Sequence, residues 1–403
     1  MTADAFTLDL FADGFADDPY PHYAALRAAA PVHEHPLGFW LVSRHADVVA
    51  VQRGPHSVDE RNLGALPSWK RDSGSIGREN RMLRGLAMLD QDPPNHTRLR
   101  RLVTAAFTRR AVGELEARIT DLVDAALDRI ADKGRADVVD ELAFPLPFTV
   151  ISELLGIPVA EQQRIRALTG VLALGLEPLP DPALQARVLE AGRELTALVG
   201  DLARWKRGHP GPDLFSALIE AEDHGDVLDE DELVAQVAFL YVAGHETTMN
   251  QIAGGLVALL RHPGQLRRLR ADPALAGTAV EELLRYDTPV HLMRRITLAP
   301  LRIGDAEIPA GAWVVACLAA ANRDPAFWGP DADELRLDRP DAHRAVSFGA
   351  GAHHCLGAAL ARVEARIAFS RFARRFADAE LEEVRWNGRI NVRGPASAIV
   401  RVG

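Results

Sequence analysis

The longest helical pattern in the chain runs from residue 229 to 262, DEDELVAQVAFLYVAGHETTMNQIAGGLVALLRH. At 1.5 Å per residue, a helix of this length extends about 50 Å. Acidic residues at its start and Arg261 and His262 at its end suit the two ends of the helix dipole. The pattern therefore predicts one helix long enough to cross a whole domain.

Polar residues interrupt the middle of this apolar pattern, at Gly244-His245-Glu246-Thr247. Glycine weakens a helix, and a threonine hydroxyl can bond to the carbonyl of the preceding turn, so we expect a local distortion here. A buried carboxylate is costly unless it has a partner or a function. Taken alone, these residues leave open a structural Thr-Glu pair and a functional polar site.

The rest of the chain predicts a mainly α fold with a small β portion. Apolar residues recur every three or four positions over 112–131 and 183–206, as in amphipathic helices. Strand-like runs occur at 38–44, over 301–316, where an Ile-Pro-Ala-Gly turn separates two of them, and from residue 390 onwards. No linker or repeat divides the chain, so we expect residues 1–403 to form a single domain. Its β-rich part should lie at roughly 30–60, 290–320 and 385–403.

Composition and charge exclude several classes of protein. The 403 residues are 48% hydrophobic and 25% charged, as in ordinary globular proteins. A formal net charge of -10 argues against a nucleic-acid partner, since phosphate neutralisation requires clustered Lys and Arg.

The sequence shows no signal peptide and no membrane-spanning segment. The first 18 residues contain no basic segment followed by an apolar run, and the apolar run at 310–321 is too short to span a bilayer. The only two cysteines, Cys317 and Cys355, suggest a reducing compartment. We therefore expect a soluble, cytoplasmic protein without a membrane anchor.

The stretch SFGAGAHHCLG, residues 347–357, places two histidines and a cysteine side by side behind spaced glycines. A zinc site on His353, His354 and Cys355 would require ligands at separated spacing and a distant partner pair, whereas adjacent residues rarely converge on one ion. Cys317 lies in an apolar run and is interpreted as a buried small hydrophobe.

Two further motifs lie on predicted helices. Asp92 and Pro93 have the form of an N-cap and a first-turn proline, which places His96 and Arg100 on one cationic helical face. Such a face suits a propionate or a phosphate, or is simply exposed to solvent. Further on, Glu282 and Arg285 have the spacing of an intrahelical ion pair.

Together, these motifs resemble the cytochrome P450 haem-thiolate monooxygenases, in particular the soluble bacterial members. The stretch at 347–357 matches the family's haem-binding loop, and the family's other motifs occur in the same order over residues 92–357. The stretch at 321–339 resembles the family's meander. The positions that carry the match are Phe348, Gly349, Gly351, His353, Cys355 and Gly357 in the loop, His96 and Arg100, Ala243, Gly244, Glu246 and Thr247, Glu282 and Arg285, and Arg339 as third member of a Glu-Arg-Arg cluster.

The resemblance implies that Cys355, as thiolate, is the axial ligand of the iron of haem b, where it favours O–O cleavage. The glycines would let the loop pass close under the porphyrin, and the helix after Leu356 would point its amides at the sulfur. Propionate contacts are implied for His353, His96, Arg100 and Arg295.

The resemblance also implies an activity. Electrons from NAD(P)H would arrive through a separate ferredoxin and ferredoxin reductase, and one oxygen atom of O₂ would enter a C–H bond of a hydrophobic small molecule by hydroxylation or epoxidation, in secondary metabolism or catabolism. Glu246 and Thr247, next to Ala243 and Gly244, would organise the solvent that delivers protons. The alternative, a non-catalytic haem-thiolate sensor, would not need this pair.

Two positions depart from the family pattern or leave it undecided. A His or Arg is common three residues before the loop phenylalanine, but this chain has Ala345 there. Arg294 and Arg295 are adjacent, and we favour Arg295 as the residue that faces the haem.

Substrate-contacting candidates come from the family's usual pocket segments, although Met and Leu side chains at such places more often belong to the core. A proline-containing loop at 177–182 is a candidate lid. The apolar candidates are Leu83, Leu86, Met88, Phe239, Leu240, Val290, Leu292, Met293 and Val392.

Overall fold

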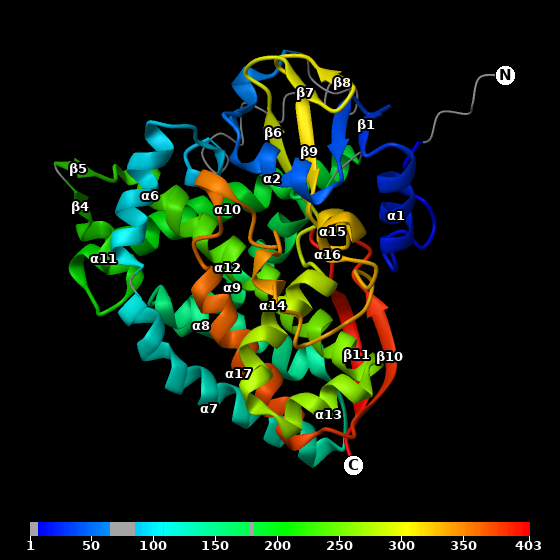
Figure 1. Ribbon diagram of the computed structural model, residues 1–403. Helices are drawn as coiled ribbons and strands as arrows, with labels where there is room; N and C mark the ends of the chain where they lie inside the picture. Colours follow the sequence, from blue (N-terminus) through cyan, green and yellow to red (C-terminus); the bar gives the residue numbers. More distant parts are fainter. Residues whose placement is uncertain (1–6, 65–84, 108, 178–180, 224) are drawn as a thin grey trace. The chain divides into compact units, whose positions relative to one another are not determined.

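The computed structural model describes residues 7–64, 85–107, 109–177, 181–223 and 225–403 (Figure 1). The chain forms two compact units. Unit 1 contains residues 1–68, 118–146 and 247–403, and unit 2 contains residues 69–117 and 147–246. Three of the four crossings between the units fall inside helices, namely α7 (Arg109–Lys133), α8 (Pro145–Leu154) and α12 (Glu230–Arg261). The predicted mainly α fold with a small β portion is confirmed.

Most of the remaining elements belong to unit 1. Its helices are α1 (Tyr20–Ala29), α2 (His45–Arg53), α13 (Pro263–Ala271), α14 (Ala276–Tyr286), α15 (Leu318–Ala321), α16 (Pro325–Trp328) and α17 (Ala358–Arg375). Its strands are β1 (Val32–His35), β2 (Phe39–Val42), β3 (Arg135–Asp137), β6 (Leu292–Ile296), β7 (Leu301–Ile303), β8 (Ala306–Ile308), β9 (Trp313–Cys317), β10 (Glu380–Trp386) and β11 (Pro395–Arg401).

Unit 2 is almost entirely helical. It contains α6 (Asn95–Ala106), α9 (Val159–Leu174), α10 (Pro182–Gly208), α11 (Leu214–Glu220) and the short hairpin of β4 (Glu222–Asp223) and β5 (Asp226–Val227). Single-turn 3-10 segments occur in both units, including one at Gly351–His353. Among the described residues, no helix is both long enough and apolar enough to cross a membrane.

A four-stranded sheet in the order β1-β2-β9-β6 forms the larger β part of unit 1. Strands β2 and β9 are parallel, and the two outer pairs are antiparallel. Helices α2 and α15 contribute Val48, Val51 and Leu318 to a fully buried cluster with Val42 and Val314 of the sheet. Helix α2 is therefore anchored on this sheet.

The β pattern was predicted incompletely. The stretch at 301–316 forms three strands rather than two, because Gly304 adopts a positive φ of 58° and adds a tight turn between β7 and β8. The C-terminal strand begins at Pro395, while Val392 makes only an isolated bridge to Val290. Strands β10 and β3, which flank β11 on its two sides, were not predicted. The sequence of β10, ELEEVRW, does not show the strict alternation of apolar and polar residues that marks a strand, because most of its side chains are charged.

The predicted helices at 112–131, 183–206 and 229–262 are confirmed as α7, α10 and α12. Helix α12 starts with a reciprocal cap: the Glu232 amide donates to Asp229 Oδ1 (2.8 Å), and the Asp229 amide donates to Glu232 Oε2 (3.2 Å). The expected distortion near Gly244 is wrong, since the α-helix is continuous through the polar residues.

Helix α6 begins later than predicted. Its first residue is Asn95, and a cis peptide bond joins Pro93 to Pro94. Asp92 is therefore not the N-cap, although its carbonyl accepts a hydrogen bond from the His96 amide at 2.9 Å.

Helix α17 packs against α13 and α14, and it also meets the C-terminal half of α12. A Cβ atom at Gly255 of α12 would lie 2.4 Å from Cζ of Phe369, so only glycine allows this approach. The contact fixes α17 and hence the cysteine loop that precedes it.

Candidate functional site

The loop that precedes α17 has the tight backbone that the glycines predicted. Gly349 and Gly351 adopt positive φ angles of 68° and 74°, and a Cβ at Gly351 would lie 2.7 Å from the carbonyl oxygen of Gln52 in α2. The Cys355 amide donates to the Phe348 carbonyl at 2.9 Å, which closes the loop. Side chains at the two glycines would open it.

The sulfur of Cys355 lies beside the N-terminus of α17. A Cβ at Gly357, the N-cap residue, would be 4.0 Å from Cys355 Sγ. The N-terminal end of a helix stabilises a thiolate. Cys355 is exposed, whereas Cys317 is buried and its pKa is raised to about 12 by that burial. Cys355 is therefore the cysteine available as a metal ligand.

Arg362 of α17 covers the ring of Phe348 in this loop. Its guanidinium carbon lies 4.4 Å from the ring centroid, and its Nε donates to Glu281 Oε1 of α14 at 2.5 Å. His354 is exposed, while His353 and Ala345 are half-buried. The loop is thus tied to α14 through its aromatic residue.

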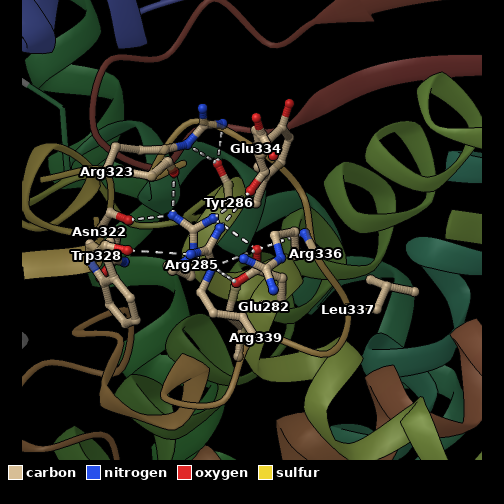
Figure 2. Close-up of polar contacts among 12 residues, drawn as sticks. Glu282, Arg285, Tyr286, Asn322, Arg323, Trp328, Glu334, Arg336, Leu337 and Arg339 are labelled. Atoms are coloured by element: carbon tan, nitrogen blue, oxygen red, sulfur yellow. Dashed lines mark hydrogen bonds and ion pairs between the residues drawn. The ribbon is translucent and has the colours of Figure 1, made fainter. Parts of the chain in front are cut away.

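Glu282, Arg285 and Arg339 form a buried network of ion pairs (Figure 2). Arg285 Nε and Nη2 donate to the two carboxylate oxygens of Glu282 at 2.7 and 2.8 Å. Its three other N–H groups bond to the carbonyls of Asn322, Ala332 and Glu334. All five donors of Arg285 are therefore satisfied.

Arg339 completes this network. Its Nε lies 3.1 Å from each oxygen of Glu282, and Nη2 donates to the Asp331 carbonyl at 2.9 Å. The Arg336 backbone amide adds a further donor to Glu282. The carboxylate of Glu282 is thus surrounded by compensating donors, although it is fully buried.

Asn322 connects the network to the cysteine loop. Its carbonyl accepts from Arg285, and its side-chain amide donates to Ser347 Oγ at 2.8 Å. Its side-chain oxygen accepts from the Val346 amide at 2.9 Å. The start of the loop is therefore held by the same charged core that fixes the segment around Ala332.

Arg294 and Arg295 point to opposite sides of β6, as neighbours in a strand do. Arg294 pairs with Glu60 at 3.1 Å and lies over Trp313. Arg295 is 3% exposed and donates from Nη2 to Gln52 Oε1 at 2.9 Å. A Cβ at Gly349 would lie 3.6 Å from that same oxygen, so Arg295 is the arginine on the side of the cysteine loop.

The polar middle of α12 is packed tightly within unit 2. A Cβ at Gly244 would lie 3.1 Å from Ile151 of α8. His245 Nδ1 bonds to the Tyr241 carbonyl at 2.8 Å, and its Nε2 lies 3.7 Å from Glu246 Oε2. Burial lowers the pKa of His245, so this ring is neutral near pH 7. Glu246 is buried and Thr247 and Ala243 are half-buried.

His96 and Arg100 lie on α6, also within unit 2. His96 is 3% exposed and Arg100 is half-buried, so the face is not simply solvated. Arg98 and Arg101 bind elsewhere, to Glu232 and Asp226. Arg98 and Arg101 are thus held by acidic residues of the same unit.

The substrate candidates fall into one group in each unit. In unit 2, Gln236 of α12 bonds to the Met88 amide (2.9 Å) and the Leu86 carbonyl (2.8 Å), which fixes that segment one turn before Leu240. In unit 1, the bridge of Val290 to Val392 places these residues beside the start of β6, where Leu292 and Met293 lie. Met88 and Val392 are almost fully buried. Phe239 is half-buried.

Leu83 and residues 178–180 of the candidate lid lie outside the described residues. Gln52 and His56, which lie near Arg295, are not among the site residues that the sequence predicted. Nothing in the local sequence marks them, because their proximity to Arg295 arises only from the folding of α2 onto the sheet.

The residues around Cys355 fit a haem. The loop has no Cβ at the positions of closest approach, the sulfur faces a helix N-terminus, and buried cationic and amide donors stand beside the loop on Arg295 and Gln52. Within the described part of the chain, no three His, Cys, Asp or Glu side chains form a metal cluster, so nothing in the geometry favours the zinc alternative.

Comparison with known proteins agrees with this geometry. The family model described as "Cytochrome P450" matches residues 203–385. The chain is 40% identical to cytochrome P450 107B1 of Saccharopolyspora erythraea, over 98% of this chain and 97% of that protein. It is also 40% identical to the cytochrome P450 monooxygenase PikC of Streptomyces venezuelae, over 99% of this chain and 95% of that protein.

Solved structures show the same fold. The myxobacterial cytochrome P450 CYP267B1, crystallised with myristic acid, superposes with a TM-score of 0.89 at 38% identity and covers 98% of both chains. The chain belongs to the cytochrome P450 family. It is a haem-thiolate monooxygenase that uses haem b, O₂ and electrons derived from NAD(P)H.

Proposed function

We propose that this monooxygenase inserts one oxygen atom into a C–H bond of a hydrophobic small molecule, by hydroxylation or epoxidation, in secondary metabolism or catabolism. Relatives support the substrate class: one is named vitamin D(3) 25-hydroxylase, in Pseudonocardia autotrophica, at 40% identity over 92% of this chain and 88% of that protein. A similar structure, P450 EryK, contains erythromycin B. The apolar character of the candidate side chains within each unit is compatible with such a ligand.

Family members normally depend on redox partners. We propose a separate ferredoxin and ferredoxin reductase for this chain, since its sequence contains no flavin or iron-sulfur motif. The test is reconstitution with ferredoxin and reductase pairs: NAD(P)H-driven product formation is expected, and activity with NAD(P)H and no added protein would contradict the proposal.

Roles follow for the residues of the site. Bound haem supplies the redox-active iron that activates O₂, and Cys355 would hold it through the thiolate stabilised at the start of α17. Arg295, His353, His96 and Arg100 would bind the propionates. Glu246 and Thr247, next to Ala243 and Gly244 in the same run, would organise the solvent that delivers protons.

The observation that carries this proposal is the position of Cys355 Sγ, on a glycine-lined loop at the N-terminus of α17. The test is the carbon-monoxide difference spectrum of the reduced protein beside Cys355→Ser. A thiolate-type Soret band that disappears in the variant is expected. A histidine-type spectrum that survives the substitution would overturn the assignment.

We also propose that residues 1–403 fold as one domain. Three of the four crossings between the units lie within continuous helices, which supports cooperative folding. Urea unfolding followed by circular dichroism and by haem absorbance should then give coincident transitions.

A further inference from the structure

A cluster of buried nitrogen atoms lies beside the cysteine loop, and two of these atoms have no hydrogen-bond partner among the described residues. The cluster consists of Gln52, His56 and Arg295, all within unit 1. Gln52 is 3% exposed at the end of α2, and Arg295 is equally buried in β6. Ser57 and Ile296 form an antiparallel β-bridge, in which the Ser57 amide donates to the Ile296 carbonyl (2.8 Å) and the Ile296 amide donates to the Ser57 carbonyl (2.7 Å). This bridge places His56 next to the segment of Arg295.

The orientation of the Gln52 amide follows from its partner. Arginine only donates hydrogen bonds, so the Gln52 oxygen must face Arg295, as the 2.9 Å contact records. The Gln52 nitrogen then points elsewhere. It is buried and has no hydrogen-bond partner among the residues that the structure describes.

His56 presents a second such atom. Its Nδ1 is buried and likewise has no hydrogen-bond partner within the described chain. Burial lowers the pKa of His56, and the charge of Arg295 lowers it further, so the ring is neutral near pH 7. A neutral imidazole carries one N–H, which Nδ1 can present.

Buried donors without acceptors cost free energy, and a set made of a guanidinium, an amide and an imidazole suits an anion. A Cβ at Gly351 would lie 2.7 Å from the Gln52 carbonyl oxygen, and one at Gly349 would lie 3.6 Å from Gln52 Oε1, so the cluster borders the loop that carries Cys355. We propose that Gln52 and His56 donate hydrogen bonds to a haem propionate, and that Gln52 also orients Arg295 toward it. His56 would thereby supply, as a neutral imidazole, the hydrogen-bond donor that is absent at Ala345.

This inference rests on haem binding, which the carbon-monoxide spectrum tests separately on the wild-type protein. Its own test measures haem loss from the loaded protein to an excess of a haem-scavenging apoglobin. Gln52→Glu keeps an acceptor for Arg295 but turns an oxygen toward the propionate, and His56→Phe removes the imidazole. Each variant should lose haem about tenfold faster than wild type, as expected for one hydrogen bond to a charged group.

A matched control and a modified haem separate this role from a structural one. Gln265→Glu alters a glutamine of α13 whose oxygen accepts from the Leu337 amide, and it should lose haem at the wild-type rate. With haem dimethyl ester, whose propionates carry no charge, wild type and variants should lose haem at similar rates. The proposal would be overturned if both variants lost native haem at the wild-type rate. It would also be overturned if their faster loss persisted with the ester. If Gln52→Glu does not fold, Gln52→Asn replaces it, because it retracts the amide by one methylene.

Discussion

Two buried polar clusters of unit 1 differ in how completely the protein satisfies them. In the network of Glu282, Arg285 and Arg339, every N–H of Arg285 meets a protein acceptor. In the cluster of Gln52, His56 and Arg295, two buried nitrogen atoms find no hydrogen-bond partner in the described part of the chain. The closed network is organised for stability, whereas the open cluster is organised to receive a ligand.

Removing the central carboxylate is the most severe way to break the closed network. Glu282→Ala leaves two buried guanidinium groups without their shared partner, and should reduce the free energy of unfolding by about 3–5 kcal/mol. Urea unfolding measures this loss. Glu281→Ala is the control, because Glu281 makes only a partly exposed pair with Arg362 and should cost about 1 kcal/mol or less. Equal losses in the two variants would show that the network adds nothing.

A second buried carboxyl, Glu364 of α17, sharpens the comparison. It is 1% exposed, its Oε2 has no hydrogen-bond partner among the described residues, and burial raises its pKa from 4.5 to about 8. Between these values the folded protein keeps a proton that the unfolded chain has released. Stability should therefore fall as pH rises from 4.5 to 8 and then level off.

Glu364→Gln should remove this pH dependence and raise the free energy of unfolding by a few kcal/mol at pH 9, less than the Glu282→Ala effect. Urea unfolding at pH 5, 7 and 9 measures it. A wild-type slope that is retained in the variant would assign the dependence to other groups.

A substitution in the middle of α12 should change the reaction rather than the stability of the protein. Thr247→Ala should leave substrate binding intact but divert electrons to hydrogen peroxide, because the hydroxyl no longer positions the proton-delivering solvent. Product formed per NAD(P)H consumed should fall about tenfold. Paired assays of product and peroxide test this, with Thr247→Ser as the control that keeps the hydroxyl. Unchanged coupling in Thr247→Ala would remove the proposed role.

The smallest effect is expected at Arg294, the neighbour of Arg295. Its pair with Glu60 is about one-third exposed on both sides, so Arg294→Ala should cost less than about 1 kcal/mol. Haem loss should stay at the wild-type rate, whereas Arg295→Ala should accelerate it. Faster loss in Arg294→Ala would show that the wrong arginine had been assigned to the haem side.

Much of the site could be predicted because its residues form local motifs. The loop at 347–357, the polar run at 243–247 and the pair of Glu282 and Arg285 each depend on spacing within one turn or one helix. The predicted start of α6 was wrong, and one of the three strands at 301–316 was not predicted. Turn geometry at Pro93-Pro94 and Gly304 is only weakly encoded by neighbouring residues.

The sequence by itself determined the family, the long helix α12 and the loop that carries Cys355, the proposed iron ligand, because each is encoded in contiguous or regularly spaced residues. Only the tertiary structure decided which of two adjacent arginines faces the loop and that Gln52 holds it across 243 positions of sequence. It also decided that Glu364 Oε2 meets no donor among the described residues while Glu282 is surrounded by donors. The physical reason is that hydrogen-bond satisfaction of a buried group depends on every segment packed around it, and local periodicity does not specify those segments.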